Sequence, residues 1–555
     1  MNLFKICTIF YKNNISYLVV SILFVLIYYP LEMIIFGFLF SKIFSKIGDI
    51  KRNINSIIIL IGIIIIANII LEIVSYVKDI FDAKYVPLME NKVRNDIIDI
   101  IYKKLSINYE SINNAEFIGR LLKIPTFLSF FFERIWKSLL PMSISIIFVS
   151  LFYLFMNWRL GVLAIILNSL YFIIFIKISQ KNIKNSRLRE NNENKLLDEI
   201  DDSLNNSFSV ITSGNINKEK NRINYLHSNF NNINNYTMKN VGKVRFITNL
   251  LNITIFCILF FYIIYLYKNN YISNTLTITF IIILSLLIKQ IRNNIPRNTE
   301  MFVFWGTIKE NDNFISYLEN DMFIDGTMNN ININGKIEFK NVSFSYPNSS
   351  QKILKNFSLK INPGENIAII GKNASGKTSI IKLLLGFYKV SEGEILINGI
   401  NVKNIKKEYL RNRISIVHQN VKLFNRSVLE NIAFGTKYSK EEIKKKLKNL
   451  KVMEVFDKLP NGIETMAGKY GDKLSGGQKQ IIYMLRCYFR ENPIILLDEP
   501  TSAVDQYHKN FVLEMIKELS KNATCIIVSH DPSIYNSGLF PKKYIIEYGI
   551  LKPFQ

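Results

Sequence analysis

Long apolar segments divide the chain unevenly, because they are concentrated before about Leu287. They lie at Ile15–Phe40, Ile57–Val74, Leu139–Met156, Leu160–Ile178, Leu250–Tyr267 and Ile272–Leu287. Each is close to the roughly 17–25 residues with which an apolar helix crosses a bilayer. Residues 1–320 are therefore predicted to form an all-α polytopic membrane domain with about six transmembrane helices.

The connections between these segments are of two kinds. Those around Asn157–Arg159 and Lys268–Asn270 are short, whereas Lys78–Lys137 and Lys181–Lys243 are long, polar and show helical apolar spacing. The pattern predicts helices that continue beyond the membrane. We expect them to reverse near Asn108–Gly119 and Ser213–Lys220, where Asn, Ser and Gly interrupt the pattern. A separate helical subdomain is the alternative.

Two residues stand out within the first apolar segment. Pro30 is expected to kink its helix. An ionised Glu32 in hydrocarbon would be costly unless it faced water or a partner, so it is a candidate cavity residue. A position at the headgroups is equally compatible with the sequence. Lys289 and Arg292 end the last apolar segment and are interpreted as interfacial anchors.

The pattern changes after Arg292, and Asp321–Gly335 has the composition of a linker. Beyond it, Ile337–Tyr346 alternates apolar and polar residues, which predicts a half-buried strand. Another strand, Ile367–Ile370, precedes Gly371–Thr378, which fits G-x-x-x-x-G-K-[ST]. Such a loop holds phosphates with backbone N–H groups and a helix N-terminus, while its lysine and hydroxyl reach the γ-phosphate side and Mg²⁺.

A second phosphate-site signature follows. Ile494–Leu497 is an apolar strand that ends in Asp498 and Glu499. A carboxylate there holds Mg²⁺, and the next one is placed to activate water. The two motifs together predict an α/β P-loop ATPase domain over residues 336–555.

Five motifs in this order resemble ATP-binding cassette (ABC) transporters of the half-size exporter type. The pentapeptide Leu474–Gln478 resembles the family signature, and Gln419 lies in a segment similar to the Q-loop. Ser502–Asp505 resembles the D-loop, and His530 resembles the switch histidine. The resemblance covers essentially the whole chain, and it implies a membrane domain followed by one ATPase domain.

The resemblance also implies the site residues. The catalytic group is Glu499, His530, Lys377 and Gln419, and the Mg²⁺ ligands are Thr378, Gln419 and Asp498. ATP is expected to contact Tyr346, Gly371, Asn373, Ala374, Ser375, Gly376, Lys377, Thr378, Ser379, Ser475, Gly476, Gly477, Gln478 and Asp505. Tyr346 has the place of the adenine-stacking aromatic residue.

Because the family's signature contacts the phosphate of the opposite subunit, a dimer is implied. A homodimer is the simplest form, and a heterodimer with a related half-transporter is the alternative. Two residues depart from the family pattern. Ala374 replaces a usual glycine, and Lys469 replaces a usual glutamate shortly before the signature.

Composition changes this picture little. Hydrophobic residues make up 49% of the chain, and the mean hydropathy is +0.15. The formal charge is +25. We attribute the excess of basic residues to cytoplasmic loops that face anionic lipid, because no nucleic-acid recognition motif accompanies the charge. The four cysteines have no C-x-x-C spacing, so neither a zinc site nor a disulfide framework is indicated.

We therefore predict an ATP-hydrolysing transporter that exports or flips an amphipathic or hydrophobic substrate, such as a peptide, lipid or drug. Its expected location is the bacterial cytoplasmic membrane, with the N-terminus and the ATPase domain in the cytoplasm. An ATP-gated channel, a membrane-bound regulatory ATPase and an importer built on the same fold are the alternatives.

Overall fold

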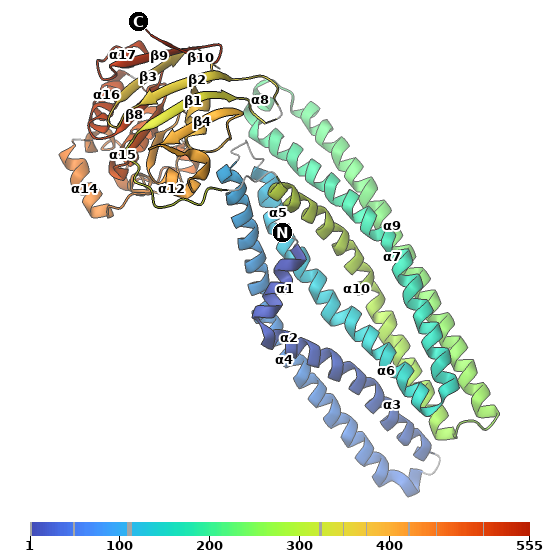
Figure 1. The fold of residues 1–555 in the computed structure, drawn as a ribbon. Helices are drawn as coiled ribbons and strands as arrows, with labels where there is room; N and C mark the ends of the chain where they lie inside the picture. Colours follow the sequence, from blue (N-terminus) through green and yellow to red (C-terminus); the bar gives the residue numbers. More distant parts are fainter. Residues whose placement is uncertain are drawn as a thin grey trace. The chain divides into compact units, whose positions relative to one another are not determined.

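The computed structural model describes residues 3–47, 50–107, 114–320, 325–347, 349–372, 375–419, 422–450, 452–502, 504 and 506–554. Contacts divide the chain into two compact units (Figure 1). Unit 1 contains Met1–Tyr102 and Ser111–Asp321, and unit 2 contains Lys103–Glu110 and Met322–Gln555.

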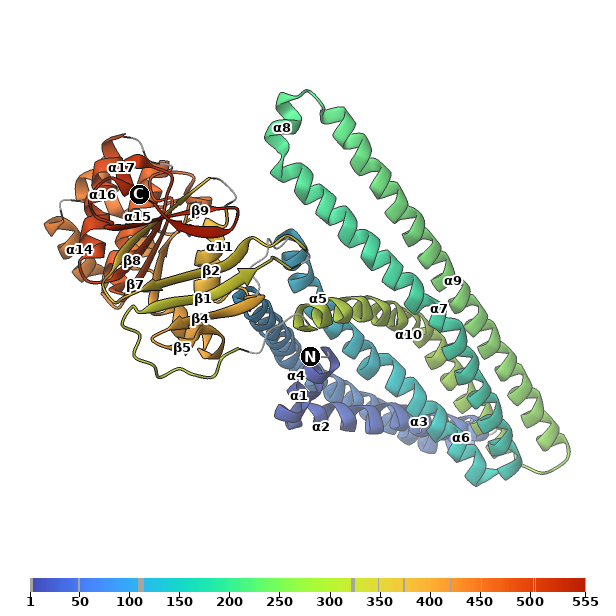
Figure 2. The ribbon, with the colours of Figure 1, turned by 45° about the horizontal axis from the view of Figure 1, so that its top comes forward.

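Unit 1 is helical. Its elements are α1 (Leu3–Asn13), α2 (Ile15–Leu23), the π-helical η1 (Phe24–Tyr28), α3 (Tyr29–Lys46), α4 (Ile50–Ile107), α5 (Asn114–Arg134), the π-helical η3 (Ile135–Leu139), α6 (Leu140–Met156), α7 (Trp158–Asn205), α8 (Ser207–Thr212), α9 (Ile216–Lys268) and α10 (Asn274–Asn320). Figure 2 shows α7 and α9 side by side along most of their length, joined at one end through α8.

The helical membrane region predicted from the apolar pattern is confirmed. Five helices of the described chain are long and apolar enough to cross a membrane, or up to six if the bent pair Leu3–Asn13 and Ile15–Tyr28 is one span. The helices α7 and α9 have 48 and 53 residues, so both extend well beyond bilayer length. The first predicted reversal, Asn108–Gly119, lies outside the described residues up to 113, and Asn114 begins α5.

Helix α1 was not predicted as a separate element. It meets the following helix at 91° and buries Leu3, Ile6, Cys7, Phe10 and Tyr11. These residues recur every three or four positions, which is the signal of an amphipathic helix. The indole N–H of Trp136 donates a hydrogen bond of 3.1 Å to the hydroxyl of Tyr11.

The irregularity expected at Pro30 is a π-helical turn. The segment η1 directly precedes α3, in which Pro30 occupies the first turn. Proline has no backbone N–H, and wide turns are one way in which a helix accommodates a lost hydrogen bond. The chain therefore continues in one direction through residues 15–46 rather than ending at the proline.

Unit 2 contains two sheets. The antiparallel sheet has the order β2-β1-β4-β5, formed by β1 (Ile337–Phe344), β2 (Leu354–Ile361), β4 (Glu392–Ile397) and β5 (Ile400–Asn401). The larger sheet has the order β10-β9-β3-β8-β7-β6, formed by β3 (Asn366–Gly371), β6 (Ile414–Val417), β7 (Ile494–Asp498), β8 (Thr524–Val528), β9 (Lys542–Glu547) and β10 (Ile550–Pro553). Strands β3, β6, β7, β8 and β9 pair in parallel, which confirms the α/β class of this half.

The helices of unit 2 are α11 (Lys377–Leu384), α12 (Lys407–Arg411), α13 (Val428–Ala433), α14 (Lys440–Asn449), α15 (Gly476–Arg490), α16 (Gln506–Ser520) and α17 (Pro532–Tyr535). Short 3₁₀ turns lie at Val402–Asn404, Met453–Val455, Gly462–Glu464 and Lys469–Gly471. Buried residues of β7, α15 and α16 share one apolar core with α13 and α14.

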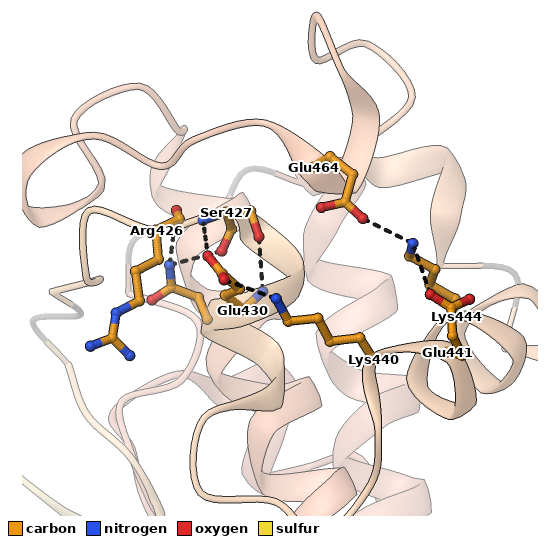
Figure 3. Close-up of polar contacts among 8 residues, drawn as sticks. Arg426, Ser427, Glu430, Lys440, Glu441, Lys444 and Glu464 are labelled. Atoms are coloured by element: carbon orange, nitrogen blue, oxygen red, sulfur yellow. Dashed lines mark hydrogen bonds and ion pairs between the residues drawn. The ribbon is translucent and has the colours of Figure 1, made fainter.

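Polar contacts fix the segment around α13 and α14 (Figure 3). Ser427 caps α13 by accepting a hydrogen bond from the backbone N–H of Glu430, whose carboxylate accepts one from the backbone N–H of Ser427. Glu430 also pairs with Lys440 at 2.9 Å, and Lys444 pairs with Glu464 at 3.0 Å. Because these pairs are largely exposed, the cap contributes more to local order than the pairs do.

The described part of the predicted linker, residues 325–335, packs along the sheets and helices of unit 2. The backbone N–H of Met328 donates to the carbonyl of Asn404, and the hydroxyl of Tyr409 donates to the carbonyl of Ile331 at 2.7 Å. Ile333 is buried in the core of the antiparallel sheet. This stretch is therefore held in place on unit 2.

Candidate functional site

The glycine-rich loop joins β3 to α11, as the apolar run before it predicted. Gly376 precedes α11 with a φ of +104°, a left-handed conformation that glycine adopts without strain. A Cβ atom there would lie 3.1 Å from Leu354 Cδ2 and 3.2 Å from Ile353 Cγ2. Glycine is thus required both by the backbone conformation and by the space.

Lys377, the first residue of α11, points back into this loop. Its ammonium donates hydrogen bonds to the carbonyls of Gly371 at 2.7 Å and Lys372 at 3.0 Å. Burial lowers the pKa of Lys377, and the nearby carboxylates of Glu499 and Asp498 oppose this effect. An anion in the loop would favour the charged form of this ammonium.

The loop also contains an unsatisfied polar atom. The hydroxyl of Ser375 is buried and has no hydrogen-bond partner among the described residues. A buried hydroxyl without a partner is unfavourable, and a phosphate oxygen is a suitable acceptor for it. The loop glycines, the cation of Lys377 and this hydroxyl together fit a nucleotide phosphate. Asn373 and Ala374, also expected here, lie outside the described residues.

Tyr346 follows β1 and reaches α11. Its hydroxyl lies 2.9 Å from the hydroxyl of Ser379, and its ring packs edge-on against Phe344 and Tyr388. The ammonium of Lys382 lies 5.4 Å from the centre of the ring. These contacts hold the aromatic residue near α11, the helix that follows the phosphate loop.

Thr378 and Asp498 form the candidate metal position. The threonine hydroxyl donates to Oδ1 of Asp498 at 3.5 Å, from the first turn of α11 to the end of β7. Burial raises the pKa of Asp498, and the hydrogen bond from Thr378 opposes this effect. A hydroxyl and a buried carboxylate are the oxygen ligands that Mg²⁺ prefers, and the cation would stabilise the ionised carboxylate. The residues therefore fit the metal.

Glu499, directly after β7, is held by two side chains from separate segments. Nε2 of Gln419 donates to its Oε2 at 2.9 Å, and Nδ1 of His530 lies 3.0 Å from its Oε1. The backbone of Glu499 is left-handed, with a φ of +47°, and its N–H donates to the carbonyl of Val528 on β8. The structure thus brings together three of the four predicted catalytic residues around one carboxylate.

The predicted signature residues begin α15. Ser475 is the N-cap, and its hydroxyl accepts a hydrogen bond from the backbone N–H of Gln478, while Oε1 of Gln478 accepts one from the backbone N–H of Ser475. The backbone N–H groups of Gly476 and Gly477 find no acceptor among the described residues. A Cβ atom on Gly477 would lie 3.2 Å from the ring of His508. The helix start therefore presents two free N–H groups, which suit an anion.

The sequence did not point to Asp531, which follows the predicted catalytic residue His530. Its Oδ2 accepts a hydrogen bond from Thr501 at 2.9 Å and pairs with Lys509 at 2.7 Å. Burial would raise the pKa of Asp531, but hydrogen bonds from Lys509, Ser533 and Thr501 outweigh it and lower the pKa to about 2. A carboxylate that precedes a short helix is a capping signal in the sequence. The predicted D-loop residue Asp505 lies outside the described residues.

Lys469 lies in a sharply turned segment before α15. Tyr470 has a φ of +58° between Gly468 and Gly471, and it is 51% exposed. The ammonium groups of Lys469 and Lys422 lie 5.5 Å and 5.1 Å from the centre of its ring. The change from the family's usual glutamate thus places a cation beside an exposed aromatic ring.

Comparison with known proteins agrees with this geometry. The family described as "ABC transporter" matches residues 354–502. The ATP-dependent lipid A-core flippases of Escherichia coli K12 and Shigella flexneri are 39% identical over 198 residues, which is 35% of this chain. That alignment spans 34% of the length of each flippase.

A structural likeness covers the two units. The structure titled "Structure of a bacterial Atm1-family ABC exporter with ATP bound" matches with a TM-score of 0.85 and 19% sequence identity. It covers 97% of this chain and 94% of the other. Residues 354–502 of this integral membrane protein match the ABC transporter family, and the chain has the fold of that exporter structure.

Proposed function

We propose that this protein is a primary active transporter, which couples ATP hydrolysis to the export or flipping of an amphipathic substrate. The observation that carries the proposal is the position of Glu499. It is fixed by Gln419 and His530 beside the Thr378–Asp498 pair, in a chain that also has helices of membrane-spanning length.

In this proposal, ATP binds along the glycine loop. Gly371, Gly376 and the start of α11 offer backbone N–H groups, while Ser375 and Lys377 supply a hydroxyl and a cation for the phosphates. Tyr346 stacks on the adenine. Asn373, Ala374 and Ser379 complete the nucleotide contacts.

Thr378, Asp498 and Gln419 would hold Mg²⁺, which supplies charge neutralisation for the phosphates when it is bound. Glu499 accepts a proton from the attacking water, and Gln419 and His530 hold its carboxylate in position. His530 also donates to the phosphate as charge develops there.

We further propose that two copies of the chain complete the site. Ser475, Gly476, Gly477 and Gln478 lie at the start of a helix, where the free N–H groups of Gly476 and Gly477 would contact the γ-phosphate bound by the other copy. Asp505 is expected to belong to the same site. A partner is needed because, by the resemblance to ABC transporters, the signature of one chain faces the glycine loop of the other. The homodimer is the simplest arrangement, and a related half-transporter could replace one copy.

Closure of the two ATPase domains would then be transmitted by the ends of α7 and α9 around α8, and the spans would alternate between inward and outward access. The ATPase domain and the N-terminus would lie in the cytoplasm, since ATP is supplied there.

The test is ATP-dependent accumulation of a fluorescent amphiphile in inside-out vesicles that contain the full chain. We expect uphill accumulation, and its loss in Lys377→Ala, which removes the phosphate-binding cation. Lys406→Ala, which changes an exposed ammonium in the same domain, is the control. ATP hydrolysis without accumulation of any amphiphile in the panel would instead favour a regulatory ATPase.

A further inference from the structure

Unit 1 contains a cavity of about 700 Å³ among α3, α4 and α10. Ligand sites in proteins commonly have volumes of about 300–1,000 Å³, so this cavity is large enough for a lipid-sized molecule. Helices α3 and α4 are consecutive in the sequence, whereas α10 is the last helix of unit 1, and the cavity lies outside the ATP site.

One face of α10 supplies most of the polar groups. Leu286, Lys289, Gln290, Asn293 and Arg297 all line the cavity. Residues three or four positions apart share a helix face, so this set forms a continuous stripe. At a rise of about 1.5 Å per residue, Lys289 and Arg297 lie about 12 Å apart along the axis, with Asn293 between them.

The residues of α3 that line the cavity change from polar to aromatic along the helix. Tyr29 and Glu32 lie at one end, followed one to three turns later by Phe36 and Phe40. Helix α4 adds Asn68 beside them. Figure 1 shows that α3 and α10 run in opposite directions, and a Cβ atom on Gly37 would touch Ile283.

These directions give the cavity two ends. The phenylalanines of α3 lie on the same side as Leu286, whereas Tyr29 and Glu32 lie on the side of Lys289 and Arg297. One end is therefore apolar and aromatic, and the other carries two cations, one carboxylate and several amides.

The polar groups of α10 remain available. Neither side-chain atom of Gln290 has a hydrogen-bond partner among the described residues, although both atoms are buried. No ion pair with an N–O distance of 4.0 Å or less joins Lys289 or Arg297 to another described residue, although Glu32 is close enough to Lys289 for the two charges to interact. By contrast, Glu300, one turn beyond, is bonded to Arg245 at 2.8 Å and to Arg134 at 3.5 Å. This end of the cavity therefore has two cations and the single carboxylate of Glu32, which leaves an excess of positive charge.

We propose that this cavity binds an amphiphile with an anionic, phosphate-like head group. This proposal rests on the proposed transport function. The head group lies between Lys289 and Arg297 and accepts hydrogen bonds from Gln290 and Asn293. The apolar chain lies against Phe36, Phe40 and Leu286. Glu32 faces the outer part of the head group, where it accepts hydrogen bonds from hydroxyl or amino groups.

The test is binding of lysophosphatidic acid, which has one acyl chain and a phosphate head group, to the purified full chain without nucleotide. Monoacylglycerol with the same acyl chain lacks the phosphate, and glycerol 3-phosphate lacks the chain. We expect lysophosphatidic acid to bind at least roughly tenfold more tightly than either, because hydrogen bonds to charged groups are the stronger ones.

Arg297→Gln and Lys289→Gln should each weaken lysophosphatidic acid binding by roughly tenfold and leave monoacylglycerol binding unchanged. Arg292→Gln is the matched control, since this exposed arginine lies on the same helix but does not line the cavity. Lys289→Arg should retain binding, which separates the loss of charge from misfolding.

Phe36→Ala should weaken both acylated ligands, whereas Phe44→Ala, at a position that is 54% exposed, should not. Equal binding of the phosphate and neutral ligands, or equal effects of Arg297→Gln and Arg292→Gln, would overturn the proposal. Glycerol 3-phosphate that binds as tightly as the acylated ligand would also overturn it. Selective binding without ATP hydrolysis would overturn the transport function alone, whereas ATP hydrolysis without selective binding would overturn this inference alone.

Discussion

The ATP site and the membrane cavity use similar charged groups in opposite ways. At the ATP site, Glu499 is bonded to Gln419 and His530, and Lys377 is bonded to two loop carbonyls. In the cavity, Lys289 and Arg297 line open space, and Gln290 has no partner among the described residues. Preorganised groups suit one defined reaction, whereas free groups can adapt to ligands of varied shape. Substitutions should therefore act differently in the two places.

The largest expected effect is that of Glu499→Gln. The amide keeps the shape of the side chain but cannot accept a proton, so steady-state ATP hydrolysis should fall by about 10²–10⁴-fold. ATP binding, measured with a fluorescent analogue, should be retained. Glu408→Gln is the control, because this carboxylate is 72% exposed. Unchanged turnover in Glu499→Gln would show that the fixed carboxylate is not the base.

Asp531→Asn tests whether hydrogen bonds beside the ATP site also determine stability. The pKa of Asp531 is about 2 instead of 3.8, so ionisation favours the folded state by roughly 2 kcal/mol. A lowered pKa gives stability that is present above about pH 4 and is lost as the pH falls toward 2.

Asp531→Asn should therefore unfold at a lower temperature than the wild type at pH 7, and the difference in unfolding temperature should be smaller at pH 3. Asp457→Asn, at an exposed position, should unfold like the wild type. A difference that stays constant with pH would mean that charge is not the cause.

Gly376→Ala should weaken ATP binding by about tenfold, because a left-handed backbone costs other residues about 1–2 kcal/mol. The matched substitution in the membrane unit is Gly62→Ala. A Cβ atom there has no neighbour within 4 Å, and alanine favours a helix by up to about 1 kcal/mol. Calorimetric titration with ATP and thermal unfolding would compare the two, and equal effects would contradict the role of the loop glycine.

The smallest effect is expected for Tyr346→Phe. This change removes the hydrogen bond to Ser379, which contributes about 1 kcal/mol, but it retains an aromatic ring for the adenine. ATP affinity should fall by less than about threefold, whereas Tyr346→Ala should reduce it more. The same affinity in both variants would argue against stacking.

The sequence predicted the elements that depend on local spacing. The glycine loop and the strand before Asp498 are each specified by a few neighbouring residues, and the structure contains both. The apolar periods also predicted long membrane helices. These features need no knowledge of which segments meet in space.

The features that the sequence missed depend on distant contacts. Glu32 was recognised as unusual, but Lys289 was interpreted as an anchor, and only the packing of α3 against α10 places both on one cavity. Asp531 gains its importance from Thr501 and Lys509, which lie far from it along the chain. Helix α1 had a readable apolar period, but the longer apolar run after it concealed the boundary.

The π-helical segment Phe24–Tyr28 also sets the orientation of everything before it. An α-helix turns about 100° per residue, and a π turn contains one residue more than an α turn. Deleting one residue there would restore an uninterrupted α-helix and rotate the preceding segment by about 100° relative to α3. Tyr11 would then leave Trp136, although neither residue had changed. The length of this short segment, rather than its composition, thus determines how the residues before it are oriented relative to α3.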